Sequence, residues 1–261
     1  MQTTRRPDWK RLLEVECASS PQLRRYATDP REGDCLRLLP ALRRGRALFL
    51  GNGLAILPTI LAAHFESVVV ADWDSHRVAL GVQRTDEQAI ANLAYVSIAA
   101  AEDVSARLGQ FDLVVLGEER PDAASWLPFA NVDALRRLAR AIAPDGWLMY
   151  GVRFRRLSAV VRAIARTPRR GAPALYRDHR RMLAAAAFTL VRGYGRSPDR
   201  RPYQFYIPLD DQAIMAYWLR KGGSSRRLRS RVAHAAKAAL GGLGASDYLF
   251  NNFLIAARRG P

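Results

Sequence analysis

The runs Ala47-Leu-Phe-Leu-Gly-Asn-Gly (47–53) and Val68-Val-Val-Ala-Asp-Trp-Asp (68–74) decide the fold of this 261-residue chain. Each is a short apolar strand with a distinctive end, two glycines in the first and an acid in the second. Glycines let the backbone turn sharply, and the helix expected at 54–63 favours a negative group at its N-terminus. Asp72 follows Gly53 at roughly the 20-residue spacing that suits an acceptor for a ribose diol. The pair predicts a nucleotide site, with a tight turn beside an exposed acid as the alternative.

The same alternation of strands and helices continues along the chain. Helices are predicted at 75–92 and 131–142, the second stopped by Pro144 and Gly146. Further apolar strands are predicted at 94–98, 111–116 and 147–152. Alternating units of this kind predict a parallel sheet covered by helices on both faces.

The two ends of the chain add to this core. Apolar residues at helical spacing predict short helices at 9–28 and 33–43, which form an N-terminal helical cover over residues 1–44. After strand five, helices are predicted at 160–165 and 177–187, and strands at 188–194 and 253–257. The main domain is therefore expected at 45–260, with a basic insertion at about 196–248 between its last two strands.

Positive charge is concentrated in the C-terminal part of the chain. The formal charge is +17, and residues 151–261 hold 23 basic and five acidic side chains. Such asymmetry indicates an anionic partner, although only three of the 41 basic residues are lysine, and arginine bias also follows genome base composition. The stretch 226–240 has a small apolar stripe flanked by basic residues, which fits either an anionic membrane surface or an ordinary surface helix.

Several classes of protein are excluded by composition. Hydrophobic residues make up 49% and charged residues 25% of the chain, so a sizeable core is expected. No apolar run is long enough to span a bilayer, and the start of the chain lacks the apolar stretch of an export signal. Cys17 and Cys35 are too few for a disulfide framework or a zinc site. We therefore expect a cytoplasmic protein, with peripheral binding at the inner membrane surface as an option.

These segments resemble the class I S-adenosylmethionine-dependent methyltransferases over about residues 45–260. The resemblance is carried by the glycine-rich run 47–53, the acid-tipped strand 68–74, the run Phe111-Asp-Leu-Val-Val-Leu-Gly, and 138–148 with its Pro-Asp-Gly-Trp-Leu end. It implies a Rossmann-like, mostly parallel seven-stranded sheet with a terminal antiparallel strand. The stretch 201–210 also resembles a bacterial subgroup associated with surface-polysaccharide or natural-product gene sets. A dinucleotide enzyme is disfavoured, because Ile56 replaces the last glycine of its fingerprint.

The resemblance implies a set of cofactor-binding residues for S-adenosylmethionine: Gly51, Asn52, Gly53, Leu54, Asp72, Trp73, Glu102, Asp103, Leu116 and Gly117. The sequence departs from the family at three points. Phe49 stands where an acid usually helps hold the methionine amino group, Ala55 replaces the third glycine, and Ala99 lies where an adenine-binding acid is common. One lost charge-assisted hydrogen bond costs about 1.5–3 kcal/mol, roughly ten- to a hundredfold in affinity.

Substrate contacts are expected from Glu118, Arg153, Arg155, Tyr176 and His179. Arginine forks recognise phosphate or carboxylate, which indicates an anionic acceptor. In the alternative reading, Glu118 belongs to a solvated loop and His179 is a surface residue. No catalytic residue is identified.

Three functions remain open. The first is a methyltransferase acting on a small-molecule or glycoconjugate acceptor. The second is a methyltransferase-fold protein with a degenerate cofactor site, serving as a binding or partner subunit. The third is a nucleic-acid methyltransferase, which the basic region favours and the sparse aromatics between 155 and 170 disfavour.

Overall fold

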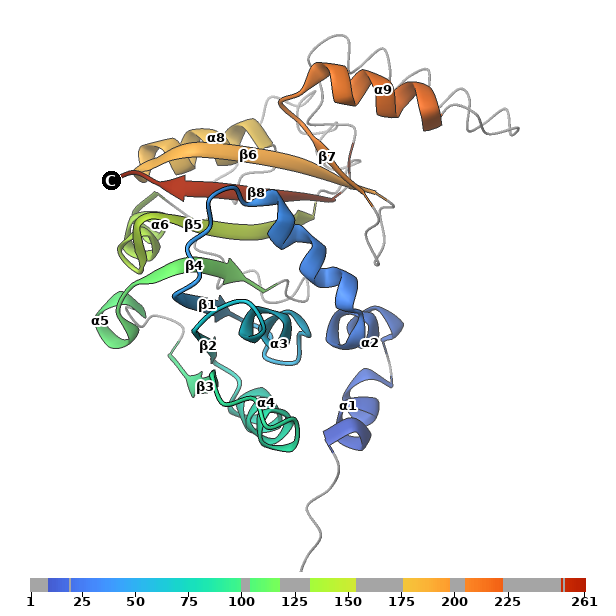
Figure 1. Cartoon of the computed structure of the whole chain (residues 1–261), viewed down its shortest axis with the longest axis vertical. Helices are drawn as coiled ribbons and strands as arrows, with labels where there is room; N and C mark the ends of the chain where they lie inside the picture. The colour runs from blue at the N-terminus through green and yellow to red at the C-terminus, as the bar shows by residue number, and fades with distance from the viewer. Residues whose placement is uncertain are drawn as a thin grey trace, which may run out of the picture.

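One eight-stranded sheet with helices on both faces forms the body of the protein (Figure 1). The computed structural model describes residues 9–18, 20–99, 104–117, 132–153, 176–197, 205–222, 250 and 252–261. Its strands are β1 Arg46–Leu50, β2 Ser67–Asp72, β3 Leu93–Ser97, β4 Phe111–Leu116, β5 Ile142–Arg153, β6 Phe188–Ser197, β7 Phe205–Pro208 and β8 Asn252–Arg259.

The strand order is β3-β2-β1-β4-β5-β8-β6-β7. Strands β1 to β5 are parallel, and β8 runs antiparallel between β5 and β6. The predicted parallel sheet with a terminal antiparallel strand is therefore confirmed. The predicted number of seven strands is wrong by one, because β7 pairs antiparallel with β6 at the edge. β7 ends at Pro208, and an edge strand tolerates proline because it need not donate on its outer side.

The helices are α1 Trp9–Cys17, α2 Pro21–Thr28, the 3₁₀ helix η1 Pro30–Leu38, α3 Leu57–Ala62, α4 Ser75–Glu87, α5 Val104–Leu108, α6 Val132–Arg140, α8 Tyr176–Ala185 and α9 Gln212–Gly222. α4 is shorter than the predicted 75–92. Asp74 caps its start through the N–H groups of His76 and Arg77, and Ala89, just past its end, has a φ of 52°. The helices predicted at 160–165 and 226–240 lie outside the described residues.

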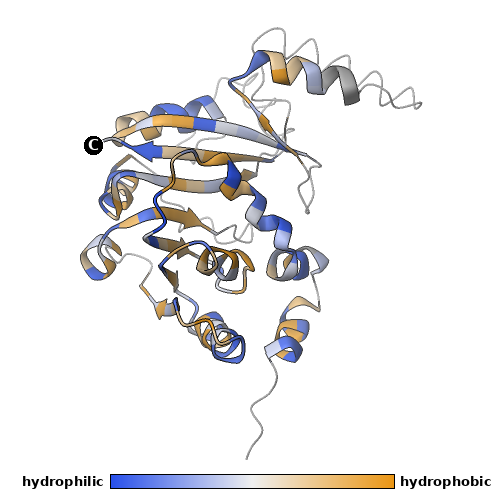
Figure 2. Cartoon of the chain, in the orientation of Figure 1, coloured by the Kyte–Doolittle hydropathy of each residue, from blue (hydrophilic) through white to orange (hydrophobic). Residues whose placement is uncertain are grey.

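Alternating side chains along each strand divide the core between the two faces of the sheet. Leu48 and Leu50 of β1 face α6 and α8, where Leu135 and Leu183 are fully buried. Phe49, between them, faces α2, η1 and α3 in a second cluster. Figure 2 shows the middle strands as largely hydrophobic, whereas α1 and α4 carry both hydrophobic and hydrophilic residues. Both faces of the sheet are therefore covered, as the apolar strands predict.

The carboxyl ends of β4 and β5 point to the side of the molecule on which α1 and α2 lie (Figure 1). β1 lies between β2 and β4, so the chain changes direction across the sheet at this point. In open α/β sheets, ligands bind outside the carboxyl ends at such a switch point. No helix in the described part of the chain is long and apolar enough to cross a membrane.

Candidate functional site

The glycine loop Gly51–Gly53 follows β1 at the switch point. Gly51 has a φ of 109°, which side chains other than glycine rarely adopt, and its N–H donates to Ala71 O at 2.9 Å. A Cβ on Gly53 would lie 3.3 Å from the Tyr95 ring and 3.5 Å from Asp72 Oδ2. The backbone angle therefore requires glycine at position 51, whereas a Cβ at position 53 would require the Tyr95 ring to shift by a few tenths of an ångström.

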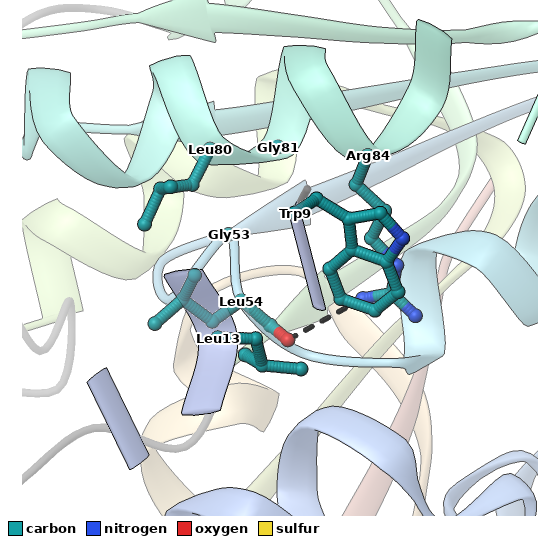
Figure 3. A pocket seen from close by; sticks show the side chains of 7 residues that line it. All are labelled: Trp9, Leu13, Gly53, Leu54, Leu80, Gly81 and Arg84. Atoms are coloured by element: carbon teal, nitrogen blue, oxygen red, sulfur yellow. Dashed lines mark hydrogen bonds between the residues drawn. The ribbon is translucent and has the colours of Figure 1, made fainter. Parts of the chain in front are cut away.

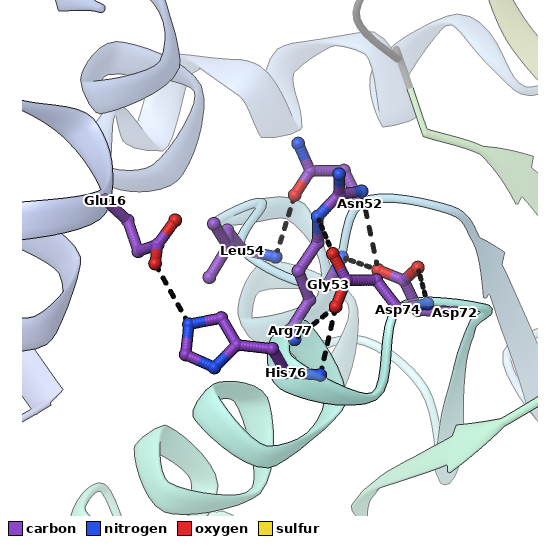
Figure 4. Close-up of polar contacts among 8 residues, drawn as sticks. All are labelled: Glu16, Asn52, Gly53, Leu54, Asp72, Asp74, His76 and Arg77. Atoms are coloured by element: carbon purple, nitrogen blue, oxygen red, sulfur yellow. Dashed lines mark hydrogen bonds and ion pairs between the residues drawn. The ribbon is translucent and has the colours of Figure 1, made fainter. Parts of the chain in front are cut away.

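Asp72 ties the end of β2 to this loop (Figure 4). Its Oδ2 accepts from the Gly53 N–H at 2.8 Å, and its Oδ1 accepts from the Asp74 N–H at 3.0 Å. Arg77 Nη1 lies 3.9 Å from Oδ2 and Arg77 Nε lies 3.2 Å from Asp74 Oδ2. The structure thus brings together the glycine loop and the acid that the sequence paired.

The Asp72 side chain is 0% exposed. Burial raises the pKa of Asp72, and the N–H groups of Asp74 and Gly53 and the charge of Arg77 oppose the shift. A carboxylate has about four acceptor positions, of which the two N–H groups use two. The carboxylate keeps acceptor capacity, but a ligand reaches it only if a covering group moves. Arg77 is one such group, and its side chain is 26% exposed.

The other two residues of the predicted loop have structural partners. Asn52 is buried, and its Oδ1 accepts from the Leu54 N–H at 3.1 Å. The Leu54 side chain packs with Leu13 of α1 and Leu80 of α4, so only its backbone belongs to the loop.

Tyr95 in β3 contacts the glycine loop through its hydroxyl group and its ring. The sequence pattern did not predict this contact. Its Oη donates to Gly53 O at 3.4 Å, and burial raises the pKa of Tyr95 to about 12, which keeps the phenol protonated. Its ring lies against Gly81 of α4, where a Cβ would collide with ring atoms. A glycine inside an amphipathic helix often makes room for a neighbouring side chain. Gly81 was therefore the feature of the sequence that could have indicated a large side chain packed against α4.

Phe49 occupies the position where the family usually has an acid. The side chain is 0% exposed and lies in the apolar cluster with Val70 and Val115. Gly117 follows β4 directly above the ring, since a Cβ there would lie 2.9 Å from Phe49 Cε1. The position is therefore part of the core and offers no polar contact to a ligand.

Those of the remaining predicted cofactor residues that the structure describes lie near the carboxyl edge of the sheet. Trp73 is partly exposed after Asp72, and Leu116 is buried in the core at the end of β4. Ala99 is exposed two residues beyond β3, and Ser97, which ends β3, pairs with Asp72. Glu102 and Asp103 lie outside the described residues.

The predicted substrate residues are divided between buried and undescribed positions. Tyr176 and His179 of α8 are 4% and 3% exposed, so the surface placement of His179 is wrong. His179 Nδ1 lies 3.0 Å from Tyr150 Oη, and Tyr176 Oη donates to Asp210 Oδ2 at 2.8 Å. The Tyr176 ring packs on Gly193 of β6, where a Cβ would lie 2.5 Å from the ring, and the His179 ring packs edge-on against Phe253 of β8. Glu118, Arg155 and the Arg153 side chain lie outside the described part of the chain.

Helix α1 covers the chain that leaves the glycine loop (Figure 3). Arg84 of α4 is 3% exposed, and its Nη1 donates to Ala55 O at 3.1 Å. The Trp9 ring lies over its guanidinium at 4.7 Å, and the Glu87 carboxylate accepts from the Trp9 N–H at 3.2 Å. The sequence predicted a helical cover here, but it gave no sign of the buried arginine.

No protein-family model matches the chain, and no curated protein matches it in sequence. Solved structures do match in three dimensions. YjhP from Escherichia coli has a TM-score of 0.53 at 14% identity, covering 96% of this chain and 100% of YjhP. Phosphoethanolamine N-methyltransferase 2 from Haemonchus contortus, solved with phosphomonomethylethanolamine and S-adenosylhomocysteine, has a TM-score of 0.53 at 11% identity, covering 98% of this chain and 61% of the other.

A third match is the [4+2]-cyclase SpnF, with a TM-score of 0.50 at 16% identity, covering 88% of this chain and 80% of SpnF. SpnF is a cyclase, so one fold supports more than one chemistry. Identities this low establish the architecture alone. The chain has the Rossmann-like α/β fold that class I methyltransferases share.

Proposed function

We propose that this protein is an S-adenosylmethionine-dependent methyltransferase acting on a small-molecule or glycoconjugate acceptor, preferably an anionic one. The observation that carries the proposal is the bond between Gly53 N–H and Asp72 Oδ2, which joins the glycine loop to the acid at the switch point. The methyltransferase of similar fold that was solved with S-adenosylhomocysteine supports the same cofactor class.

The residues present fit the nucleoside part of this cofactor. Gly51 has the positive φ that turns the backbone sharply at the end of β1, and Asp72 has acceptor capacity for a ribose diol once the groups above it move. The methionine end of the cofactor has fewer polar contacts available, because Phe49 is an apolar core residue. We therefore expect weaker affinity than in relatives that carry the acid.

Bound S-adenosylmethionine would supply a methyl group on a positively charged sulfur, and an acceptor nucleophile would bond to the methyl carbon as the carbon–sulfur bond breaks and the thioether leaves. The chain contributes position and exclusion of water, since the departing thioether needs no proton. Gly51 and Gly53 belong to the loop that the cofactor would contact, and Asp72 would orient its ribose. A hydroxyl or amine acceptor also needs a base, and none is assigned.

The preference for an anionic acceptor rests on the arginines that follow β5. Arg153 ends β5 at the carboxyl edge, and Arg155 follows it in the sequence. Reversing both charges, Arg153→Glu with Arg155→Glu, is expected to abolish binding of anionic acceptors while cofactor binding persists. Loss of cofactor binding in the same variant would contradict this assignment.

The first test is calorimetric titration with S-adenosylmethionine, S-adenosylhomocysteine and NAD. Micromolar binding of the first two without NAD binding is expected. Asp72→Asn should lower both affinities at least about tenfold, the value of one charge-assisted hydrogen bond. Asp86→Asn is the matched control, because it removes the same charge from an exposed position of α4.

A second function is favoured by two observations, the apolar Phe49 and the full burial of Asp72. In this second function, the protein is a binding or partner subunit whose cofactor site is degenerate. The same titration discriminates the two, because this function predicts no binding of either sulfur compound up to about a millimolar.

A further inference from the structure

A second cavity lies outside the glycine-loop site. Its volume is about 350 Å³, and its walls come from α1, α2, the chain after the glycine loop, and α4. Small-molecule sites usually measure about 300–1,000 Å³, so this cavity has room for a small ligand. The lining includes none of Gly51, Asn52, Gly53 or Asp72. It shares Trp9, Leu13 and Arg84 with a smaller pocket that reaches Gly53 and Leu54, so the cavity adjoins the glycine loop without including it (Figure 3).

Arg84 is the unusual member of the lining. It is 3% exposed, yet no carboxylate among the described residues forms an ion pair with it. Its Nη1 donates to the carbonyls of Ala55 and, at 3.5 Å, Leu54, whereas its buried Nε has no hydrogen-bond partner within the described structure. Burial lowers the pKa of Arg84, which reflects the cost of holding this charge in the interior. A buried, uncompensated guanidinium with a spare donor is suited to an oxyanion.

The other charges around the cavity leave it positive. Lys10 and Arg24 line it together with Arg84, against the single acid Glu14. Glu14 pairs with Arg24 at 3.8 Å, and both side chains are 65% exposed. An exposed pair of this kind is weak. An incoming oxyanion therefore competes easily for Arg24.

The rest of the wall is apolar. Leu13 of α1 and Ala27 of α2 are buried in one apolar cluster, Ile56 also lines the cavity, and the Trp9 ring stacks on Arg84. We propose that this cavity binds a small amphipathic anion, a phosphate or carboxylate attached to an apolar group, with the oxyanion on Arg84 and Arg24. The apolar part lies against Trp9, Leu13 and Ile56. This site does not depend on the proposed methyltransferase activity.

The test is an NMR titration of the full-length protein carrying ¹⁵N-labelled tryptophan. Five indole resonances are available, and Trp9→Phe identifies that of Trp9. Phenyl phosphate and benzoate are the probes, inorganic phosphate tests the oxyanion alone, and benzyl alcohol tests the apolar part alone. We expect a saturable shift of the Trp9 resonance with phenyl phosphate or benzoate, at lower concentrations than with the other two. The tighter of the two probes identifies phosphate or carboxylate as the preferred head group.

Adjacent arginines on α2 provide a matched pair of variants. Arg24 lines the cavity and Arg25 does not, although both are exposed. Arg24→Gln should weaken probe binding about two- to fivefold, the usual value of an exposed charge contact, and Arg25→Gln should leave it unchanged. Arg84→Lys, which keeps the charge but loses the planar fork, should weaken it roughly tenfold. If Arg84→Lys fails to fold, the Arg24 and Arg25 pair decides the question.

The proposal is overturned if no probe shifts the Trp9 resonance at concentrations up to about 10 mM, because any binding beyond that concentration is too weak for a useful site. It is also overturned if Arg24→Gln and Arg25→Gln affect binding equally. Asp72→Asn should leave phenyl phosphate binding intact, and a loss there would place the probe in the glycine-loop site instead. Failure of S-adenosylmethionine to bind would contradict the proposed function without affecting this result.

Discussion

Asp72 has a structural role, and the proposed function adds a binding role for the same carboxylate. It holds the loop after β1 through the Gly53 N–H and the chain after β2 through the Asp74 N–H. Full burial makes the charged form costly, while the two N–H groups offset part of that cost. In the proposed function, the carboxylate that organises the loop also accepts hydrogen bonds from the ribose.

The first prediction concerns pH. The pKa of Asp72 in the free protein lies above the ordinary 3.8, and the charged carboxylate is a stronger acceptor for two hydroxyls than the protonated form. Affinity for S-adenosylmethionine should therefore be constant at neutral pH and begin to fall, as the solution is acidified, at a higher pH than for an ordinary aspartate. Titration across a pH series checks this. In Asp72→Asn the dependence should vanish, and its persistence would assign it to another group.

A second prediction at the residue scale concerns Gly81. In most helices, replacing glycine by alanine adds about 1 kcal/mol of stability. Here the new Cβ meets the Tyr95 ring. Overpacking of this kind costs about 1–3 kcal/mol, so Gly81→Ala should destabilise the protein in urea denaturation. Val82→Ala, at a 41% exposed neighbour, is the control, and Tyr95→Val should rescue the variant by removing the ring.

At the scale of elements, α1 is held to the fold by a few specific contacts. The Glu87 carboxylate accepts from the Trp9 N–H at the start of the helix. His76 Nε2 lies 2.9 Å from Glu16 Oε1. Leu13 packs in one apolar cluster with Leu54 and Leu80. A helix of nine residues is marginal by itself, so these contacts provide its stability.

The third prediction follows from that attachment. Trp9→Ala removes the ring over Arg84, and a partly desolvated cation–π contact is worth about 1–2 kcal/mol. The variant should lose that much stability and exchange the amide protons of α1 faster. Val15→Ala is the matched control, because Val15 is 68% exposed on the same helix. Equal effects of the two substitutions would show that the contact between Trp9 and Arg84 adds no more stability than an exposed side chain of α1.

At the scale of the whole molecule, the two core clusters share one sheet. Leu135 of α6 belongs to the cluster on one face and Leu61 of α3 to the cluster on the other, and both are 0% exposed. Both clusters include residues of β1, β4, β5 and β8. The same strands therefore contribute side chains to the core on both faces of the sheet.

The fourth prediction is that both faces unfold together. Leu135→Ala and Leu61→Ala should each cost about 2–5 kcal/mol, the usual value for a buried leucine. Each should shift a single transition, with near-ultraviolet and far-ultraviolet circular dichroism following the same denaturation curve. Separate transitions in either variant would show that one face unfolds independently.

Much of the fold was available from periodicity alone. β4 has the predicted bounds 111–116, and β2 ends at Asp72 as predicted, because apolar runs between turn residues mark buried parallel strands. β7 was missed, since a short strand at an edge carries too little pattern to stand out from an insertion. β5 begins at Ile142 rather than Trp147, because the turn around Asp145 is absorbed as an irregularity in its pairing with β4.

The sequence by itself determined the order of strands and helices, and it paired the glycine loop with Asp72. These features depend on local periodicity and on short spacings. Only the tertiary structure decided that Tyr95 supports Gly53, that His179 is buried, and that Arg84 lies under Trp9 without an acidic partner among the described residues. Those contacts join residues that are distant in the sequence or depend on which helix face meets the sheet, and neither property is written in the local pattern.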